Sequence, residues 1–299
     1  MNKKAYKRKK INRARPADYI MAVFISILCL TCILPFIHLA AKSISGNSAV
    51  MAKEVLFIPK DITFEAYKAV FGDKSLMHSL VYSVLVTVIF TVLGMIVCTC
   101  AAYPLAKKRL KGRRILTFIL IVPMYFNAGL IPTYLLYSKL NLIDSMWVLI
   151  LPLIYSAYNM VIMKSYFQTP EFESLEEAAK IDGSSDISTL FRVILPLSKP
   201  IIATLSLFYA VGRWNAYADN MYFIRKKNNL KMIQYLLYRM VASATESQTT
   251  ALSEAGSVTS TPEVLQAAAV MFVTIPIIIV YPFLQKYFSK GAFTGAIKA

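Results

Sequence analysis

The sequence predicts an all-α integral membrane protein, and three observations support this prediction. Of the 299 residues, 57% are hydrophobic and only 16% are charged, against about 45–50% and about 25% in soluble domains. The mean hydropathy is +0.54. The apolar residues also occur in blocks long enough to cross a bilayer, which argues against a cytosolic enzyme. The formal charge of +17 lies largely in two short clusters and does not indicate a nucleic-acid partner.

Six transmembrane helices are predicted, because a helical span needs ~20 mostly apolar residues. Their expected ranges are 19–41, 80–102, 115–137, 146–166, 201–220 and 266–288. Pro123, Asn127, Gly129 and Pro132 interrupt the third range. Broken helices of this kind often move or line a pore in transporters.

The basic residues orient these helices, since short cytoplasmic loops retain Lys and Arg. Eight of them lie in the first fifteen residues, and six lie between 107 and 114. Both clusters are expected inside, so both termini are predicted to be cytoplasmic. The external loops then lie near 42–77, 138–144 and 221–265. The stretch 241–262 is rich in Ser, Thr, Ala and Glu and predicts a polar surface loop.

A cleaved signal peptide is the competing interpretation of the N-terminus, with Ala40-Ala41 as a weak cleavage site. The apolar stretch exceeds the roughly 7–15 residues of a signal core, so an uncleaved first helix is predicted. No metal site is expected, because the cysteines lie inside predicted spans without acidic or His neighbours. These cysteines are Cys29, Cys32, Cys98 and Cys100. His38 and His78 are interpreted as interfacial residues near span ends.

The connection at 168–200, between the fourth and fifth predicted spans, is the most informative stretch. Ser174 and Glu177 have the spacing of a capping box, which predicts a helix start. Gly183 is suited to end or bend this helix, and a second short helix is expected over 187–194. Six acids and several apolar residues occur on a side where loops are normally basic. This pattern favours a docking element for a cytoplasmic partner over a solvated acidic loop.

This connection resembles the EAA loop of ABC importer permeases. The residues that carry the resemblance are Glu177-Ala178-Ala179, Gly183 and Val193-Ile194-Leu195-Pro196. Val193 is the one departure, since it replaces the usual Ile. Trp214-Asn215 is similar to a motif of the maltose-type carbohydrate permeases, and the run 281–291 resembles the C-terminal signature of their oligosaccharide and polysaccharide subgroup. The resemblance covers nearly the whole chain and is weakest in the N-terminal tail and over 240–262.

The resemblance implies the permease subunit of an ABC importer that takes up sugars, expected to be oligosaccharides, by alternating access. No P-loop is present in the sequence, so ATP and Mg are expected on a separate ATPase. No catalytic residue and no cofactor is expected in the chain itself. The implied partners are a second permease, expected to be a related chain, a dimer of cytoplasmic ATPase and an extracellular solute-binding protein. The implied location is a prokaryotic plasma membrane, with multiple passes.

The resemblance also assigns ATPase coupling to a helical EAA segment over about 170–197. The coupling residues that it implies are Glu177, Ala178, Ala179, Asp182, Gly183, Leu195 and Pro196. Glu177 is expected to make a polar or ionic contact with the ATPase, and a plain helix cap is its alternative role. The expected organisation is a basic tail over 1–18, a permease domain over 19–288 and a cytoplasmic tail over 289–299.

Polar and aromatic residues of the fourth and fifth spans are the candidates for sugar contact, because polar groups in a bilayer usually face the bundle interior. They are Tyr155, Tyr158, Asn159, Tyr209, Arg213, Trp214, Asn215 and Tyr217. At helical spacing, Arg213 shares a face with Tyr209, Tyr217 and Asn220. A cavity-facing Arg213 would suit an acidic sugar. Interfacial aromatic residues, helix packing and a snorkelling Arg213 are the alternatives.

Two other functions are left open. A permease for peptides or amino acids would share the EAA loop, and only the Trp-Asn and C-terminal motifs favour sugars. A stand-alone secondary transporter belongs to a different class, in which two similar halves and intramembrane acids are common. No clear repeat is visible in the sequence, and Asp219 is the only acid well inside a predicted span.

Overall fold

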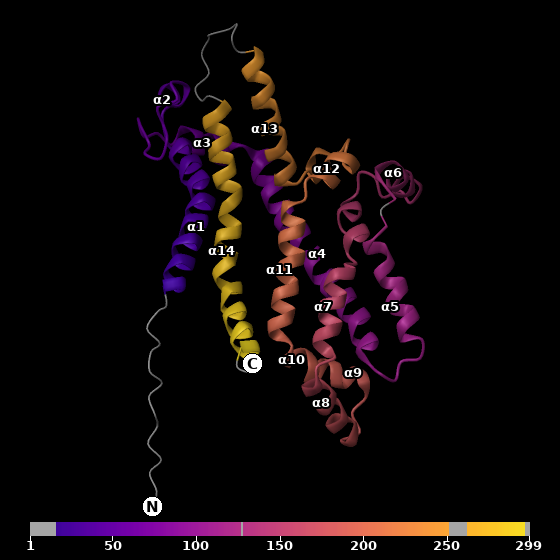
Figure 1. Ribbon diagram of the computed structural model, residues 1–299. Coiled ribbons are helices and arrows are strands. Elements are labelled where there is room, and N and C mark those ends of the chain that lie inside the picture. Colours follow the sequence, from indigo (N-terminus) through magenta and orange to yellow (C-terminus); the bar gives the residue numbers. More distant parts are fainter. Residues whose placement is uncertain (1–15, 127, 251–261, 297–299) are drawn as a thin grey trace, which may run out of the picture. The chain divides into compact units, whose positions relative to one another are not determined.

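The computed structural model describes residues 16–126, 128–250 and 262–296, and this described part is helical with no strand (Figure 1). Three helices are long and apolar enough to cross a membrane: α1 (Pro16–Ser43), α4 (Lys74–Ala106) and the first part of α14 (Pro262–Ala296). Two bent helix pairs bring the candidate spans to five. The prediction of an all-helical membrane protein is confirmed, and six spans stay a prediction.

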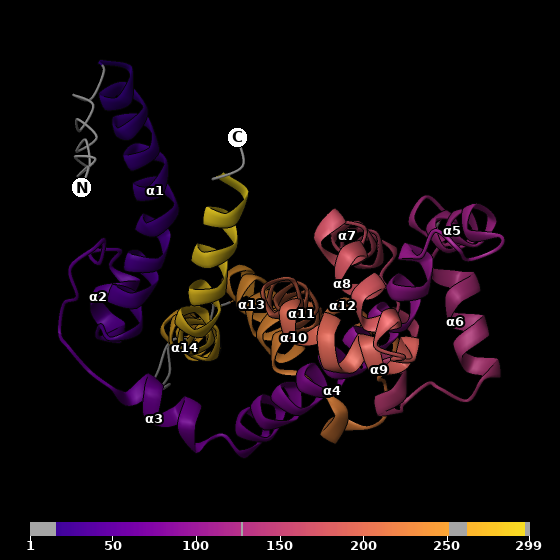
Figure 2. The ribbon, with the colours of Figure 1, turned by 90° about the horizontal axis from the view of Figure 1, so that it is seen from below.

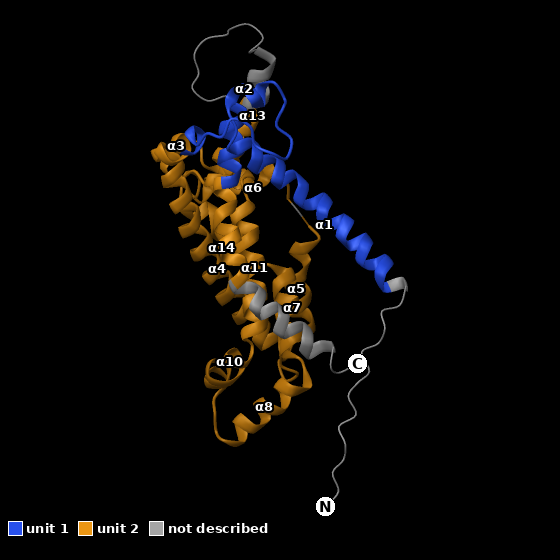
Figure 3. Ribbon diagram, turned by 90° about the vertical axis from the view of Figure 1, so that its left-hand side faces the viewer, with its two compact units in different colours: residues 1–67, 257–271 blue, residues 68–256, 272–299 orange. Residues whose placement is uncertain are grey.

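The chain divides into two compact units, which are described separately. Unit 1 comprises residues 1–67 and 257–271, and unit 2 comprises residues 68–256 and 272–299 (Figure 3). In unit 1, residues 18–37 of α1 are exposed on all sides, as expected of an apolar helix whose solvent is lipid. The shorter helices near its end are α2 (Asn47–Met51) and the start of α3 (Glu65–Gly72).

In unit 2, the long helix α4 carries the core. α7 (Ala157–Phe167) and α11 (Lys199–Asn215) both pack against it (Figure 2). The approach of α11 depends on Gly94, because a Cβ at this position would lie 2.7 Å from the Tyr209 ring. The fully buried side chains between these helices include Val86, Met160 and Leu205.

The interruption predicted in the third span is confirmed. Its residues form α5 (Arg113–Ile121), the 3-10 turn η1 (Val122–Met124) and α6 (Leu130–Lys139). Pro123 lies inside the 3-10 turn, where its missing N–H ends the regular ladder. Gly129 precedes α6 with a φ of +83°, a left-handed conformation that favours glycine. Asn127 lies outside the described residues.

The fourth and fifth spans are also bent. The 3-10 turns η2 (Met146–Leu149) and η3 (Leu151–Leu153) meet α7 at 47°. A chain of short helices precedes α11, and its last part, Asp186–Leu197, meets α11 at 83°. These short helices are α8 (Pro170–Ile181), α9 (Asp186–Thr189), η4 (Leu190–Ile194) and α10 (Leu195–Leu197). The residues 170–197, to which the resemblance assigns ATPase coupling as an expectation, are called the coupling segment below.

Three elements follow α11 at the end of unit 2 that lies away from the coupling segment: α12 (Ala218–Phe223), η5 (Asn228–Leu230) and α13 (Ile233–Thr250). The polar loop predicted over 241–262 is wrong for its first part, because α13 continues to Thr250. Ala, Glu and Gln in this stretch have good helix propensity, which outweighs its polarity. Residues 251–261 lie outside the described residues. α14 continues to Ala296, so the predicted tail begins as helix.

Candidate functional site

The coupling segment starts with a helix whose two ends follow from local sequence. α8 begins at Pro170, because a first helical position needs no N–H. At its other end, Gly183 has a φ of +76° and its N–H donates to Lys180 O at 2.9 Å. The N–H of Ser184 donates to Ala179 O at 2.9 Å. These two bonds form a Schellman motif, which needs a left-handed residue at Gly183. The predicted helix end at this glycine is therefore confirmed.

The capping box predicted at Ser174 and Glu177 is wrong. Thr169 and Pro170 start α8 one turn earlier, so Ser174 lies inside the helix. Its hydroxyl donates to Pro170 O at 3.2 Å and to Glu171 O at 3.1 Å. Glu177 is exposed in the middle of α8, and helix capping does not account for it.

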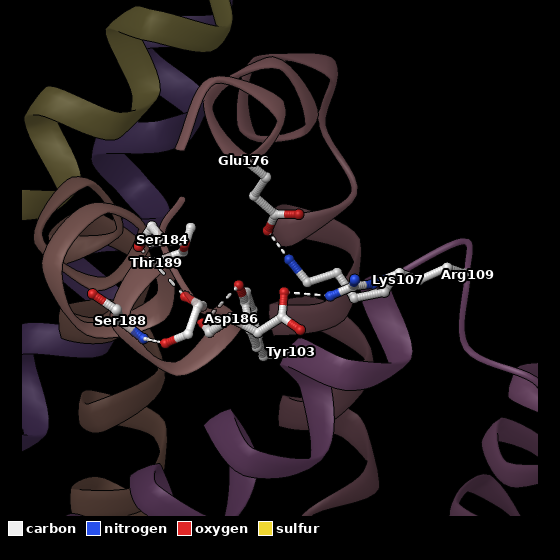
Figure 4. Close-up of polar contacts among 9 residues, drawn as sticks. Tyr103, Lys107, Arg109, Glu176, Ser184, Asp186, Ser188 and Thr189 are labelled. Carbon is white, nitrogen blue, oxygen red and sulfur yellow. Dashed lines mark hydrogen bonds and ion pairs between the residues drawn. The ribbon is translucent and has the colours of Figure 1, made fainter. Parts of the chain in front are cut away.

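Basic residues at the end of α4 hold the coupling segment. Lys107 pairs with Glu176 on α8, and these two side chains are only 11% and 13% exposed. The Lys107 ammonium also lies 3.7 Å from the centre of the Tyr103 ring. Arg109 pairs with Asp186 on α9, and the Tyr103 hydroxyl donates to the backbone oxygen of Asp186 at 3.3 Å (Figure 4). The last turn of α4 is thereby joined to both α8 and α9.

The ion pair of Arg109 is more exposed, with side-chain exposures of 54% and 51%, and so is a third pair in the same place. Lys108 Nζ lies 2.7 Å from Glu173 Oε1, with side-chain exposures of 76% and 46%. Water screens such a pair, which typically contributes little. Lys107 differs because burial lowers the pKa of its ammonium, and the hydrogen bond to Glu176 raises the pKa only part of the way back. Lys107 has lost much of its hydration and depends on Glu176 for compensation.

The sequence prediction used these basic residues only to orient the spans and missed their contacts. A signal was available: six acids lie in the coupling segment, and a basic cluster was predicted on the same side of the membrane. Opposite charges on neighbouring loops favour pairing. The pairing was not predicted because Lys107 and Glu176 are far apart in the sequence and lie in different predicted loops.

The outer face of the coupling segment exposes both polar and apolar side chains. Phe172, Leu190 and Ile194 are buried against the rest of unit 2, and Ile181, Ile187 and Phe191 are 87%, 72% and 63% exposed. Of the predicted coupling residues, the exposed ones are Glu177, Ala178, Asp182, Gly183 and Pro196, while Leu195 is half-buried and Ala179 is buried. Large apolar side chains that remain this exposed are candidates for contact with a partner.

Arg213 is buried and does not reach the surface. It is 1% exposed, and its Nη1 donates to Leu149 O at 2.8 Å and lies 3.0 Å from Asp219 Oδ2. Its Nη2 donates to Ala216 O at 3.4 Å. The snorkelling alternative is therefore wrong, and the charge that would suit an acidic sugar is compensated by Asp219. The prediction missed this partner, although Asp219 lies only six residues away.

The predicted shared face of the fifth span is also wrong beyond Asn215. α11 ends there, so Tyr217 and Asn220 do not continue its helical spacing. Tyr217 instead stacks on Tyr238 of α13, with ring centroids 4.6 Å apart. The helix ends because Ala216 has extended backbone angles, with φ −76° and ψ +115°, before α12 begins at Ala218.

The other candidates for sugar contact lie at different depths in unit 2. Tyr158 is 54% exposed, Asn215 is exposed and Asn159 is buried. Tyr155 precedes α7, and its hydroxyl donates to Leu120 O at 2.7 Å. The residues predicted on the fourth span therefore do not form one stripe along a helix.

Tyr209, Arg213 and Trp214 are buried on α11, and each carries a polar atom without a hydrogen-bond partner among the described residues: the Tyr209 hydroxyl, Arg213 Nε and Trp214 Nε1. Buried polar atoms are normally hydrogen-bonded, so such exceptions mark sites where a ligand or water can bind. Trp214 also borders a cavity of about 520 Å³ between α4, α11 and α14. Apart from Thr87, Thr91 and this indole, its lining is aliphatic or aromatic.

Comparisons with known proteins agree with this architecture. Residues 91–293 match the family described as binding-protein-dependent transport system inner membrane component. The polygalacturonan/rhamnogalacturonan transport system permease protein YtcP of Bacillus subtilis is 39% identical, covering 94% of this chain and 98% of that protein. Protein LplC of Bacillus subtilis is 37% identical, covering 95% of both chains.

One solved structure matches almost the full chain. It is a chain from the crystal structure of a bacterial ABC transporter involved in the import of the acidic polysaccharide alginate. The TM-score is 0.81 at 34% sequence identity, covering 92% of this chain and 99% of that one. The chain therefore belongs to the family of binding-protein-dependent transport system inner membrane components, the permease subunits of ABC importers, and is a multi-pass protein of the bacterial inner membrane.

Proposed function

We propose that this permease imports oligosaccharides or polysaccharides and takes its driving force from an ATPase that docks on the coupling segment. The observation that carries the proposal is the exposed face of this segment, with Glu177 and Gly183 beside the apolar residues Ile181, Ile187 and Phe191. A cleft of an ATPase subunit would cover these apolar side chains, which water otherwise contacts.

The proposed topology has six spans with both termini in the cytoplasm. It has a basic tail over 1–18, a permease domain over 19–288 and a tail over 289–299. The third, fourth and fifth spans are broken, and each counts as one crossing. The positions of the basic clusters near residues 1–15 and 107–114 support this orientation.

The proposed docking residues are the exposed ones of the predicted set: Glu177, Ala178, Asp182, Gly183 and Pro196. Glu177 would make the polar contact with the ATPase, and Gly183 would keep the turn free of a side chain. Leu195 and Ala179 would act inside the segment, because the first is half-buried and the second is buried.

The ion pairs of Lys107 and Arg109 give the proposed route of the driving force. The coupling segment is joined covalently to α7 and α11 only. Its link to α4 consists of side-chain contacts, chiefly Lys107 with Glu176 and Arg109 with Asp186. A push on the segment would therefore move α4 together with its two neighbours as a rigid body, as alternating-access models require.

The proposed complex contains a second, related permease, a dimer of ATPase that holds ATP and Mg, and an extracellular solute-binding protein. Two relatives carry names that suggest the substrate class: polygalacturonan/rhamnogalacturonan for one and acidic alginate for the other. We extend this to the chain and propose a polysaccharide that carries carboxylates.

Among the sugar-contact candidates, we propose Tyr209 and Trp214, whose buried polar atoms could pair with hydroxyls, and Tyr158, whose exposed ring could stack on a sugar. Tyr155, Asn159, Asn215 and Tyr217 are secondary candidates. Arg213 would position the end of α11 through Asp219 and Leu149 rather than touch the sugar.

A pull-down from native membranes in mild detergent tests the docking proposal. The tagged wild type is compared with a Glu177→Arg, Gly183→Asp variant and with Glu65→Arg, which reverses an exposed acid on α3. We expect the wild type and Glu65→Arg to bring down an ATPase and a second permease. The double variant should retain the second permease and lose the ATPase. An ATPase that stays with the double variant, or a wild type that is isolated alone, would contradict the proposal.

A further inference from the structure

A basic loop lies at the end of unit 2 that faces away from the coupling segment. Residues 225–231 connect α12 to α13 and carry Arg225, Lys226, Lys227 and Lys231. α4 separates the two ends: its 33 residues correspond to about 50 Å at the rise of an α-helix. In the proposed orientation this loop is external, where short loops are usually poor in Lys and Arg. The membrane-insertion rule does not explain these charges.

One carboxylate holds the backbone of the basic loop. Asp144 Oδ1 accepts hydrogen bonds from the backbone N–H groups of Arg225 and Lys226, at 2.7 and 2.9 Å. On the other side of the loop, the Asn220 amide donates to Leu230 O at 2.9 Å. Both anchors use the loop backbone, so the basic side chains are left to point elsewhere.

Buried residues on both sides fix the loop further. Ile224 and Met232, which flank it, are 1% and 0% exposed. The N–H of Ile233 donates to Ser83 Oγ at 2.8 Å, and His78 Nε2 lies 2.9 Å from the backbone oxygen of Asn229. The basic loop is therefore a built surface attached to the first turns of α4, and not a free connection.

The cations of this surface lack acidic partners. Within the part of the chain that the structure describes, Arg225, Lys226 and Lys227 are exposed and form no ion pair within 4.0 Å. The two nearby acids are already engaged, Asp144 with the loop backbone and Asp219 with Arg213. The arrangement thus presents a net positive charge.

Aromatic rings lie directly beside these cations. The Arg225 guanidinium is 5.5 Å from the centre of the Tyr134 ring, and the Lys231 ammonium is 5.9 Å from that of Tyr235. Aromatic faces stack on sugar rings, while guanidinium and ammonium groups bind carboxylates by charge-assisted hydrogen bonds. A chain of sugar acids offers both kinds of group along its length.

We propose that the basic loop is a receiving surface for a uronate-containing polysaccharide, with Arg225, Lys226 and Lys227 as its specificity-determining residues. This inference rests on the proposed function and orientation. It places recognition of acidic sugars at the external surface, because the only deeply buried cation of the described spans, Arg213, is compensated by Asp219.

The test uses the complete transporter with its ATPase and binding protein in proteoliposomes. The variant is Arg225→Gln, Lys226→Gln, Lys227→Gln, which keeps the backbone bonds to Asp144. The matched control is Lys68→Gln, Lys74→Gln, which removes exposed cations from α3 and from the start of α4. The two probes are an oligogalacturonide and a neutral galactan oligosaccharide of equal length, each at low and high salt.

We expect the variant to lower kcat/KM for the oligogalacturonide about tenfold, mainly through KM, and to leave the neutral probe and the control unchanged. High salt should shrink the difference between wild type and variant, because it screens exposed charges. Equal loss for both probes with weakened docking of the binding protein would overturn the proposal and make the loop a protein-docking surface. An unchanged variant would also overturn it. A wild type that imports neither probe would instead refute the proposed function.

Discussion

At the coupling end of α4, Lys107, Lys108 and Arg109 are each paired with a carboxylate of the coupling segment. At the opposite end of the same helix, the arrangement is reversed. Asp144 binds backbone N–H groups, and the basic side chains of residues 225–227 stay exposed. The same kinds of residue thus have different uses. Lys107, which is paired and largely buried, helps to hold α4 and α8 together, whereas exposed cations on an anchored backbone are available to an outside partner.

Four substitutions test this contrast, and Arg213→Gln should have the largest effect on stability. It leaves Asp219 without its cation and Leu149 O without a donor. Removing one partner of a buried pair typically costs about 3–5 kcal/mol, and we expect the lower part of this range because Asp219 keeps some access to water. The free energy of unfolding in detergent is the measurement, with Arg213→Gln, Asp219→Asn expected to regain part of the loss.

Sugar uptake adds a second test of Arg213. If the residue only positions α11, Arg213→Gln should reduce uptake of neutral and acidic oligosaccharides by the same factor. A selective loss of acidic uptake would place Arg213 at the sugar. It would also remove the contrast between Arg213, as a buried cation with a structural role, and the exposed cations of residues 225–227, which are proposed to recognise the sugar.

Lys107→Glu should have the next largest effect, because it places two carboxylates together where little water remains. We expect at least a tenfold fall in sugar transported per ATP hydrolysed, which corresponds to about 1.4 kcal/mol. The charge swap Lys107→Glu, Glu176→Lys should restore most of it. Lys108→Glu is the matched control, and its exposed pair predicts a change within about twofold. Equal losses at 107 and 108, without rescue by the swap, would mean that transport depends on the net positive charge of this region and not on the ion pair between Lys107 and Glu176.

Gly183→Ala should have a smaller effect that is confined to the coupling segment. A Cβ there meets no atom within 4 Å, so the cost comes from the φ of +76° and is about 1–2 kcal/mol. We expect a several-fold weaker affinity for the ATPase, measured with purified subunits. Gly72→Ala on α3 is the control, since that glycine has neither a positive φ nor a close neighbour. Wild-type affinity in Gly183→Ala would show that the turn geometry does not matter for docking.

Asp144→Ala should have the smallest effect, about 1 kcal/mol for the lost hydrogen bonds. Hydrogen exchange at the backbone amides of Arg225 and Lys226 is the measurement, and it should accelerate. Burial raises the pKa of the Asp144 carboxyl, but the N–H groups of residues 225–227 and the positive charge of Lys226 together lower it by more, so the net pKa lies below its usual range. The protection is therefore present above the ordinary carboxyl pKa and is lost as the pH falls through the lower folded-state value. Protection that is independent of pH would show that other contacts hold the loop.

Much of the fold could be predicted from local sequence. The apolar ranges and the breaks at Pro123 and Gly129 depend on burial in lipid and on backbone conformation, which act over a few residues. The end of α8 at Gly183 is local for the same reason. The family resemblance also excludes the stand-alone transporter, because the chain belongs to a family that works in complexes.

The errors of prediction have two physical origins: some depended on where a helix begins or ends, and others on a partner that only the fold brings close. Ser174 was predicted to cap a helix, but α8 begins earlier, at Pro170. Tyr217 was predicted to share a helix face with Arg213, but α11 ends at Asn215, before Tyr217. Helix boundaries depend on competition between neighbouring signals, which periodicity alone does not rank.

The sequence by itself determined that the chain is a helical membrane permease and that residues 177–196 resemble an EAA loop, because hydrophobic length and a local motif need no knowledge of packing. Only the tertiary structure decided which charged side chains form ion pairs within the chain and which stay exposed to an outside partner. Lys107 and Glu176 are 69 residues apart in the chain and form an ion pair, Arg213 is compensated by Asp219, and Arg225 is left exposed. A charged side chain's role depends on what lies within a few ångströms of it in space, and that distance is set by the packing of α4, α7 and α11.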